Sequence, residues 1–174
     1  MPHPDRLSGT RERPGPLAGP GPVTPPVGSR RSSGRRRAER AVLALVAVAG
    51  AVGALARYGV ALVVTAPAGH FPWGTFWINV SGSLAIGFVL VLLTERFPRA
   101  RLARPLVATG FLGGYTTFST YTVDADLLVR SHALATAALY AVASLLAGAV
   151  AVVAGMLAAR LLVRLDRRLA EQLG

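Results

Sequence analysis

The sequence predicts an all-α membrane protein with four transmembrane helices. Hydrophobic residues make up 52% of the 174 residues, the mean hydropathy is +0.48, and most apolar residues fall in long runs after residue 40. The chain also carries 19 basic residues against 8 acidic ones, and 9 of the basic residues lie in residues 1–40. Apolar and charged residues are therefore segregated along the chain, which is typical of a protein that crosses a bilayer.

The composition excludes several classes of chemistry. The chain has no Cys, so disulfides, thiol catalysis and Cys-ligated zinc are excluded. All its basic residues other than histidine are Arg, which removes Schiff-base chemistry and the lysine of a P-loop. The three histidines, His3, His70 and His132, are too scattered to suggest a metal site. No Ser/His/Asp set or pair of carboxylates near a nucleophile is evident within the spans, so we do not expect an enzyme.

Residues 1–40 are rich in Pro, Gly and Arg, which predicts a disordered basic tail because these residues cannot build a core. The tail is not a signal peptide, because no short apolar stretch with a cleavage site follows its basic residues. Its arginine cluster could bind nucleic acid or anchor the chain beside a membrane helix on anionic lipid. The apolar span that starts at Ala41 favours the lipid anchor, so nucleic acid is not an expected partner.

Residues 41–160 form the predicted four-helix transmembrane domain, and residues 161–174 form a basic C-terminal end. A helix needs about 20 predominantly apolar residues to cross the hydrocarbon core. Four segments meet this length, and each satisfies its own backbone groups when helical, as lipid demands. The segments run from Ala41 to about Thr65, from Gly74 to about Thr94, from Pro105 to about Val129, and from Ala133 to about Ala159.

The arginine distribution predicts the orientation of these spans. The tail, the link between the second and third spans, and the C-terminal end together contain 17 arginines. The opposite side contains only Arg130, and Arg57 lies within the first span. The positive-inside rule therefore predicts a multi-pass protein of the plasma membrane with both termini in the cytoplasm.

Polar and small residues recur at four-residue spacing in two spans, so each set lies along one helix face. They are Thr75, Asn79, Ser83 and Gly87 in the second span, and Thr136, Tyr140, Ser144 and Gly148 in the fourth. Such faces either line a polar path or pack helices together. We favour a functional role for Asn79 because a buried amide needs partners, and packing for Ser83 and the glycines. Tyr140 and Ser144 fit either role.

The third span contains the segment GFLGGYTTFSTYT, in which paired glycines and threonines weaken a helix near its middle. A break there would free carbonyls, which bind hard cations, and amides, which bind anions. Phe118 and Tyr121 are three residues apart and share a helix face, and their electropositive ring edges can contact an anion. Taken alone, however, the spacing of Gly110 and Gly114 also fits a simple close-packing motif.

Three segments in succession resemble the CrcB/Fluc family of fluoride ion channels. They are GAVGALARYGV, GTFWINVSGSLAIG and GFLGGYTTFSTYTVD, and the resemblance covers roughly residues 50–158. It implies a fluoride-selective channel that lowers cytoplasmic fluoride by passive efflux. It further implies four transmembrane helices with a broken third helix, and an antiparallel (dual-topology) dimer with pores at the subunit interface. A structural sodium ion at the centre of the dimer is part of the same expectation.

The resemblance also assigns roles to individual residues. The backbone carbonyls of Gly113 and Thr116 are expected to hold the Na⁺ ion. Arg57 and Asp124 are expected near an entrance or vestibule, although Arg57 also fits a snorkelling or helix-pairing role. The expected pore-lining residues that contact fluoride are Asn79, Phe118, Tyr121, Thr75, Tyr140 and Ser144.

Two features depart from the family pattern. Tyr121 stands where the family usually has Phe, which adds a hydroxyl to the aromatic pair. The one-sided arginine distribution predicts insertion in a single orientation, whereas an antiparallel dimer needs both. We therefore favour a heterodimer with a homologous subunit of opposite orientation over a homodimer.

Two other kinds of membrane protein fit the sequence less well than a channel. A small four-helix multidrug-type proton-coupled exporter needs a membrane-buried acid in its first span, where this chain has Arg57. A purely structural scaffold would leave the glycine-threonine segment of the third span and the stripe around Asn79 without a purpose. Fluoride and membrane lipid are therefore the expected partners.

Overall fold

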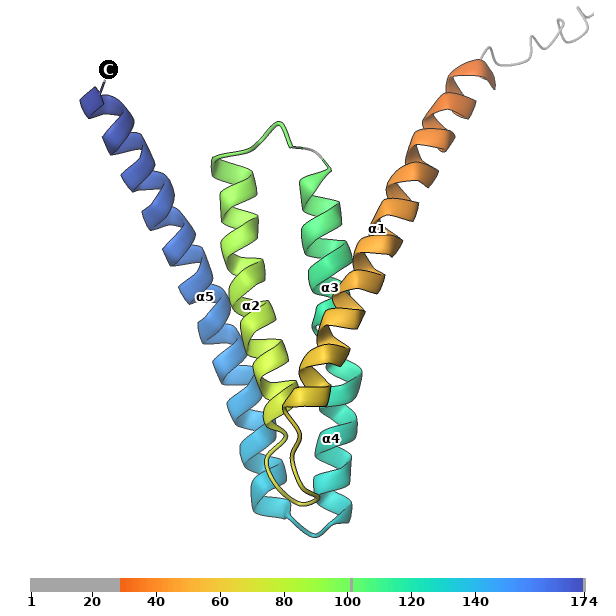
Figure 1. Cartoon of the computed structure of the whole chain (residues 1–174), viewed down its shortest axis with the longest axis vertical. Coiled ribbons are helices and arrows are strands. Elements are labelled where there is room, and N and C mark those ends of the chain that lie inside the picture. The colour runs from red at the N-terminus through yellow and green to blue at the C-terminus, as the bar shows by residue number, and fades with distance from the viewer. Residues whose placement is uncertain (1–28, 101, 174) are drawn as a thin grey trace, which may run out of the picture.

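The computed structural model describes residues 29–100 and 102–173, and the described part of the chain is helical apart from short connections (Figure 1). The described residues contain no β-strand, so the all-α prediction is confirmed for them. The elements are α1 (Ser29–Val63), α2 (Trp73–Glu95), the π-helix η1 (Arg104–Leu112), α3 (Gly113–Tyr115), α4 (Phe118–Arg130) and α5 (Leu134–Leu173).

Three of these helices, α1, α2 and α5, are long and apolar enough to cross a membrane. The second predicted span agrees with α2 to within a residue at each end. The predicted third span instead contains three consecutive elements, η1, α3 and α4, with 9, 3 and 13 residues. None of the three has the length of a membrane-spanning helix by itself.

Both terminal helices extend beyond the predicted spans. Helix α1 begins at Ser29, so residues 29–40 are helical where we expected the disordered tail to continue. This stretch follows the last proline of the tail, is rich in helix-favouring Arg, and contains an i,i+4 ion pair of 2.8 Å between Arg35 and Glu39. Residues 1–28, the rest of the predicted tail, lie outside the described residues. At the other end, α5 continues past Ala159 to Leu173.

The helices form two main packing pairs: α2 against α5, and α1 against η1 and α3. Both pairs depend on glycines that let backbones approach closely. A Cβ atom on Gly87 would overlap the Val152 carbonyl of α5, and one on Gly53 would overlap the Phe111 carbonyl of η1. Helix α4 packs on the lower part of α5 (Figure 1).

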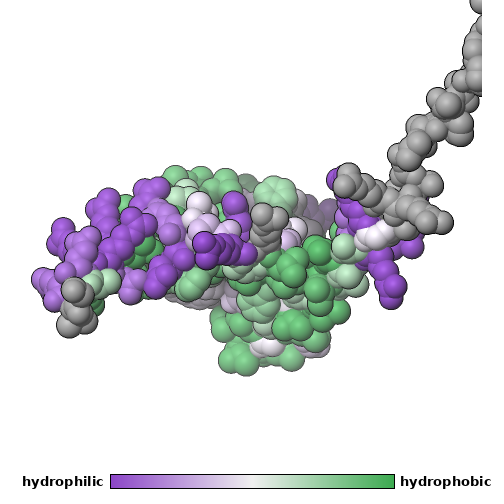
Figure 2. Space-filling model, turned by 90° about the horizontal axis from the view of Figure 1, so that it is seen from above, coloured by the Kyte–Doolittle hydropathy of each residue, from purple (hydrophilic) through white to green (hydrophobic). Residues whose placement is uncertain are grey.

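The connections alternate between two ends of the molecule. The start of α1, the link between α2 and η1, and the end of α5 lie at the upper end in Figure 1, and the other two links lie at the lower end. At the upper end, Arg96 pairs with Asp166 at 2.8 Å and Arg160 with Glu95 at 3.8 Å, which ties the end of α2 to α5. Figure 2 shows hydrophilic side chains gathered over the upper ends of the two long terminal helices. The described parts of the arginine-rich segments that the charge count assigned to one side therefore share one end.

The turn between α4 and α5 closes with a Schellman motif. The Ala133 amide donates to the Leu128 carbonyl at 3.0 Å, and the His132 amide donates to the Val129 carbonyl at 3.0 Å. His132 has a φ of 59°, the left-handed conformation that this motif requires of the residue after the helix. The motif reverses the chain, so that α5 begins beside the end of α4.

We expect Gly87→Ala to destabilise the protein, because the added methyl group overlaps the Val152 carbonyl and forces α2 away from α5. Overpacking of this kind costs about 1–3 kcal/mol. The measurement is thermal unfolding of the detergent-solubilised protein. Gly59→Ala is the matched control, since a Cβ atom on Gly59 meets nothing within 4 Å. Equal melting temperatures for the two variants would contradict the packing described here.

Candidate functional site

Most of the predicted pore residues lie around one groove between α2, α4 and α5, with a volume of about 440 Å³. Asn79, Phe118, Tyr121 and Ser144 line this groove, which we call the polar groove. The Phe118 side chain is 75% exposed, so the described residues leave most of its ring uncovered. The groove is therefore open on the side of this ring. The sequence had placed these four residues on three different spans, and the fold brings them together.

Next to the polar groove, the helical run from Arg104 to Arg130 is interrupted by two extended residues. Thr116 has φ and ψ of −77° and 157°, and Thr117 has −148° and 126°. The Asn79 side chain binds this extended backbone twice. Its Nδ2 donates to the Thr117 carbonyl at 2.9 Å, and its Oδ1 accepts from the Thr117 amide at 2.9 Å. The Asn79 amide therefore replaces the hydrogen bonds that a continuous helix would give to Thr117.

Thr117 also caps α4. Its Oγ1 accepts from the Thr120 amide at 3.1 Å, which is the usual hydrogen bond of an N-cap threonine. In a continuous α-helix the amides of Thr117 and Thr120 would donate to the carbonyls of Gly113 and Thr116. Here both amides donate to side chains instead. The two carbonyls that the family resemblance named as Na⁺ ligands have therefore lost their helical donors.

Arg57 of α1 reaches the same interruption from the other side. Its Nε donates to the Gly114 carbonyl at 3.3 Å, and its Nη1 donates to the Thr120 hydroxyl at 3.5 Å. The guanidinium is half-buried and lies where η1 and α3 end, so its charge complements the carbonyl end of a helix. These contacts make Arg57 a clamp between the two halves of the interrupted segment.

The hydroxyl of Tyr121, where the family usually has Phe, has a partner within the chain. It donates to the Ala141 carbonyl of α5 at 3.0 Å. The ring of Tyr121 lies between Phe118, with a centroid distance of 5.6 Å, and Tyr140, at 5.2 Å. The extra hydroxyl thus fixes the ring against α5 without facing the polar groove as a free donor.

Ser144 lines the same groove from α5 and is 7% exposed. Its Oγ is buried and has no hydrogen-bond partner among the described residues. A buried hydroxyl without a partner is unfavourable and calls for an explanation, such as a ligand that the chain does not itself supply.

Thr75, Asp124 and Tyr140 form a separate polar cluster next to the groove. The Thr75 hydroxyl donates to Asp124 Oδ2 at 2.6 Å, and the Tyr140 hydroxyl donates to the same oxygen at 3.5 Å. Thr75 and Tyr140 are buried, at 8% and 0% exposure. Asp124 also lines a second cavity of about 430 Å³ beside the link between α1 and α2. The carboxylate is thus held by two hydroxyls at the edge of a cavity.

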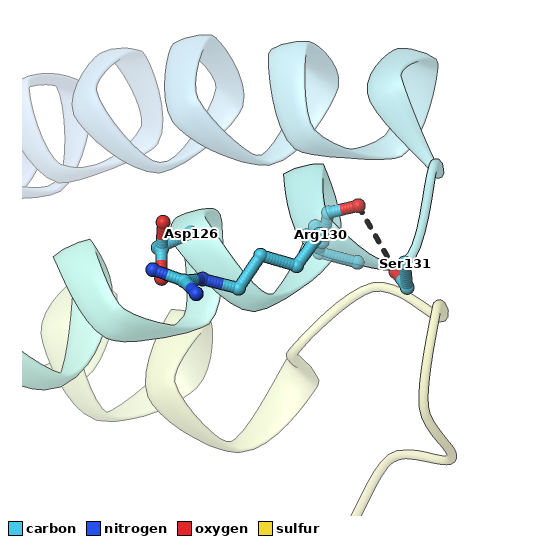
Figure 3. A network of polar contacts seen from close by, with 4 residues as sticks. Asp126, Arg130 and Ser131 are labelled. Atoms are coloured by element: carbon cyan, nitrogen blue, oxygen red, sulfur yellow. Dashed lines mark hydrogen bonds and ion pairs between the residues drawn. The ribbon is translucent and has the colours of Figure 1, made fainter.

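A second acid on α4, Asp126, belongs to the helix end instead (Figure 3). Arg130 Nε pairs with its Oδ2 at 2.6 Å, and both side chains are mostly exposed. Hydrogen bonding to Asp126, together with its negative charge, raises the pKa of Arg130 above its ordinary value. Ser131 closes the helix by donating from its Oγ to the Leu128 carbonyl at 3.0 Å. The Asp126–Arg130 ion pair therefore belongs to the end of α4 and does not line the polar groove.

The sequence analysis missed Thr117 as a member of the site. Its amide, its carbonyl and its hydroxyl all take part in holding the interruption. The available signal was a threonine placed three residues before Thr120 at the start of a new helix, a pattern typical of an N-cap. The roles in ion binding expected for the named site residues stay predictions, because the contacts described here show positions alone.

Several known proteins are similar to this chain in sequence. A family model described as "CrcB-like protein, Camphor Resistance (CrcB)" matches residues 44–156. The chain is 45% identical over 119 residues to "Fluoride-specific ion channel FluC 2" of Streptomyces avermitilis, a match that covers 66% of this chain and 75% of the relative. It is 46% identical over 124 residues to "Fluoride-specific ion channel FluC 1" of Streptomyces coelicolor, with 71% and 80% covered.

A third relative, "Fluoride-specific ion channel FluC 2" of Nocardia farcinica, is 43% identical over 120 residues, which is 69% of this chain and 86% of the relative. The range matched by the family model runs from α1 to α5 and contains all the site residues from Arg57 to Ser144. The chain is a multi-pass membrane protein that belongs to the CrcB family.

Proposed function

We propose that this chain is a fluoride-selective ion channel that lowers cytoplasmic fluoride by passive efflux. The observation that carries the proposal is the coincidence of the polar groove with a sequence 45% identical to a relative named as a fluoride-specific channel. A channel requires no catalytic group. In this proposal the cluster of Thr75, Asp124 and Tyr140 has a structural role. Fluoride is the transported ion, and no chemical change takes place.

The polar groove suits a small, strongly hydrated anion. Conduction requires that donors replace the hydration shell of the ion, yet bind weakly enough at several sites for it to leave. The groove offers hydroxyl and amide groups from Asn79 and Ser144 together with the aromatic edges of Phe118 and Tyr121. These are neutral donors, which attract fluoride without the tight binding of a full positive charge.

We infer that η1, α3 and α4 together make the third of four membrane crossings, broken at Thr116 and Thr117. Irregular backbone at membrane depth is tolerated only where it is buried in protein or lines a cavity. The side chains of Asn79 and Arg57 supply hydrogen bonds to that backbone, and Thr117 lines the polar groove. Together with α1, α2 and α5, this segment makes four crossings. An even number of crossings returns the two ends of the described chain to the same side of the membrane.

The proposed assembly is an antiparallel dimer, with a pore along each polar groove at the interface. The support is the exposure of groups that belong to the site. Phe118 is 75% exposed, and Gly113 is exposed as well. A second copy or a homologous subunit, inserted upside down, would cover these residues and complete the wall of each groove.

A structural Na⁺ ion fits the carbonyls at the break. The carbonyls of Gly113 and Thr116 lack the donors of a continuous helix, and unwound backbone carbonyls are suitable ligands for this ion. The ion would supply positive charge that holds such carbonyls from two subunits together at the centre of the dimer. Asn79 and Arg57 then act on this chain alone, by holding the backbone next to these carbonyls in its interrupted form.

The charge distribution favours a plasma-membrane location with both termini in the cytoplasm. The described arginine-rich segments, at the start of α1, between α2 and η1 and at the end of α5, lie at one end of the molecule (Figure 1). Inserting this chain upside down would carry 17 arginines across the membrane. A heterodimer with a homologous subunit of opposite charge bias avoids that cost, and several relatives bear numbered names such as FluC 1 and FluC 2.

A small multidrug-type proton-coupled exporter is the alternative function, and it is not favoured. Such an exporter needs a buried acid in the first span, and the polar side chain at depth in α1 is Arg57. The guanidinium of Arg57 binds a backbone carbonyl and a hydroxyl group within the chain. Residues 41–65 contain no Asp or Glu that could load and release a proton.

Liposomes that contain the purified protein, with and without a candidate homologous partner, are expected to release fluoride when the membrane potential is short-circuited. Chloride release is expected to stay at the level of protein-free liposomes, because chloride is larger than fluoride and fits poorly among donors spaced for a smaller ion. A fluoride electrode and a chloride electrode make the measurement. Release that depends on a proton gradient would favour the exporter instead.

Asn79→Asp is expected to abolish fluoride release. An ionised Asp accepts from the Thr117 amide but cannot donate to the Thr117 carbonyl, so one of the two hydrogen bonds at 2.9 Å is lost and a negative charge faces the carbonyl. Asp126→Asn is the control for a changed charge outside the groove, and it is expected to conduct as the wild type does. Wild-type fluoride release by Asn79→Asp would contradict a role for Asn79 in ion conduction.

When the protein is expressed alone, cysteine labels placed at the two termini are expected to react only from the cytoplasmic side. The reason is the difference of 17 arginines to 1 between the two ends. A membrane-impermeant thiol reagent on whole cells and on inverted vesicles makes the measurement. Equal labelling from both sides, combined with a homogeneous functional dimer, would exclude the heterodimer and establish a homodimer.

A further inference from the structure

The hydrogen bonds within the polar groove separate its donors into two groups. The hydroxyl of Thr116 donates to the Leu112 carbonyl at 2.9 Å, that of Thr117 to Thr120 Oγ1 at 3.0 Å, and that of Tyr121 to the Ala141 carbonyl at 3.0 Å. These donors are committed to the chain itself. One N–H of Asn79 is committed in the same way to the Thr117 carbonyl.

Three side-chain donors that line the groove remain. They are the second N–H of Asn79, the buried hydroxyl of Ser144, which has no partner, and the hydroxyl of Ser83. The Ser83 hydroxyl has no acceptor within 29–100 or 102–173, unlike that of Ser81 on the same helix, which donates to the Trp77 carbonyl at 2.6 Å. Ser83 is thus free to bind an ion, although its spacing in the sequence fitted simple helix packing.

The position of Ser83 follows from the way α2 and α5 run. Both helices rise in the same direction (Figure 1), so their four-residue polar stripes meet level by level. Thr75 and Tyr140 share Asp124 at the first level. Two turns further along each helix, a Cβ atom on Gly148 would lie 3.5 Å from Ser83 Oγ. Asn79 and Ser144 occupy the level between these two.

At the Ser83 level the opposite helix contributes no side chain, because Gly148 stands there. In front of the Ser83 hydroxyl, Gly148 leaves space for about one methyl group, since a Cβ atom there would lie in van der Waals contact with Ser83 Oγ at 3.5 Å. Beyond this level the groove is lined by apolar residues such as Ile86 and Val152. Ser83 is the last hydrogen-bond donor of the groove toward the end of the molecule that carries the arginine-rich segments.

We propose that Ser83 is a further fluoride ligand, the one that exchanges the ion between the water at the arginine-rich end and the Asn79–Ser144 level. The inference rests on the proposed channel function and adds a residue to it. A small anion that leaves water at this end meets the Ser83 hydroxyl first, and Gly148 leaves the room in which the ion sits. Ser144, one level further in, then receives it.

The test is fluoride release from liposomes with Ser83→Ala, compared with the wild type and with Ser81→Ala. Ser81 is on the same helix, and its hydroxyl donates to a backbone carbonyl outside the groove. Ser81→Ala is therefore expected to conduct as the wild type does. Hydrogen bonds to ions are stronger than those between neutral groups, and we expect Ser83→Ala to slow fluoride release about tenfold. Chloride release is expected to stay at background.

Ser83→Thr distinguishes the effect of losing the hydroxyl from the effect of altered helix packing. It keeps the donor and is expected to restore release to within about threefold of the wild type, on the same hydrogen-bond reasoning. Gly148→Ala provides an independent test, because its methyl group fits at 3.5 Å from Ser83 Oγ without overlap and fills the space for the ion. It is expected to slow release as Ser83→Ala does while the protein remains monodisperse and equally stable.

Each outcome has a distinct meaning. Wild-type protein that releases no fluoride, alone or with a homologous partner, contradicts the proposed channel function. Wild-type protein that conducts while Ser83→Ala conducts equally well overturns the assignment of Ser83 and leaves the channel intact. Wild-type release by Gly148→Ala also overturns it, because the space in front of the hydroxyl would then not be used by the ion.

Discussion

The structure depends on how the backbone of Thr116 and Thr117 is satisfied. Two extended residues within a helical run deprive the neighbouring amides and carbonyls of their helical partners, and an unsatisfied group in a lipid environment costs several kcal/mol. Asn79 replaces both hydrogen bonds of Thr117, and Arg57 binds the Gly114 carbonyl. Three helices are thereby joined at one point. The polar residues at this point hold the shape of the chain before any ion is considered.

This use of side chains has a consequence for ion binding. Polar groups near the groove serve either the backbone or a ligand, and the hydrogen bonds decide which. Tyr121 and Thr117 serve the backbone, whereas Ser144 is left with a buried hydroxyl that has no partner. The extended conformation also releases the carbonyls of Gly113 and Thr116 from helical hydrogen bonds. The interruption therefore explains why these two carbonyls lack helical donors, whereas the free hydroxyl of Ser144 comes from a different helix, α5.

The single chain does not enclose the site. Phe118 is 75% exposed beside the groove, and large apolar side chains such as Leu55 and Leu146 are exposed on the long helices. Lipid covers surfaces of this kind in a membrane protein, but an aromatic ring next to a polar groove suits a protein partner better. The proposed antiparallel assembly provides that partner. The arginine-rich end then determines which partner is compatible, because charge fixes the orientation of each chain before the two meet.

The sequence by itself determined the elements and their chemistry. Hydropathy predicted four spans, of which those represented by α1, α2 and α5 have membrane length. The arginine count predicted that the charged segments share one side, and the described ones lie at one end. Residue patterns also picked out Asn79 and Phe118, which line the same groove. Polar residues in apolar spans are visible in one dimension because lipid makes them costly. The sequence did not reveal that the helix extends back to Ser29, because local propensity overrode the composition of the tail. Nor did it tell a donor that holds the backbone from one that is free. Only the tertiary structure decided that, because hydrogen bonds such as Tyr121 to Ala141 join residues whose pairing depends on how helices meet.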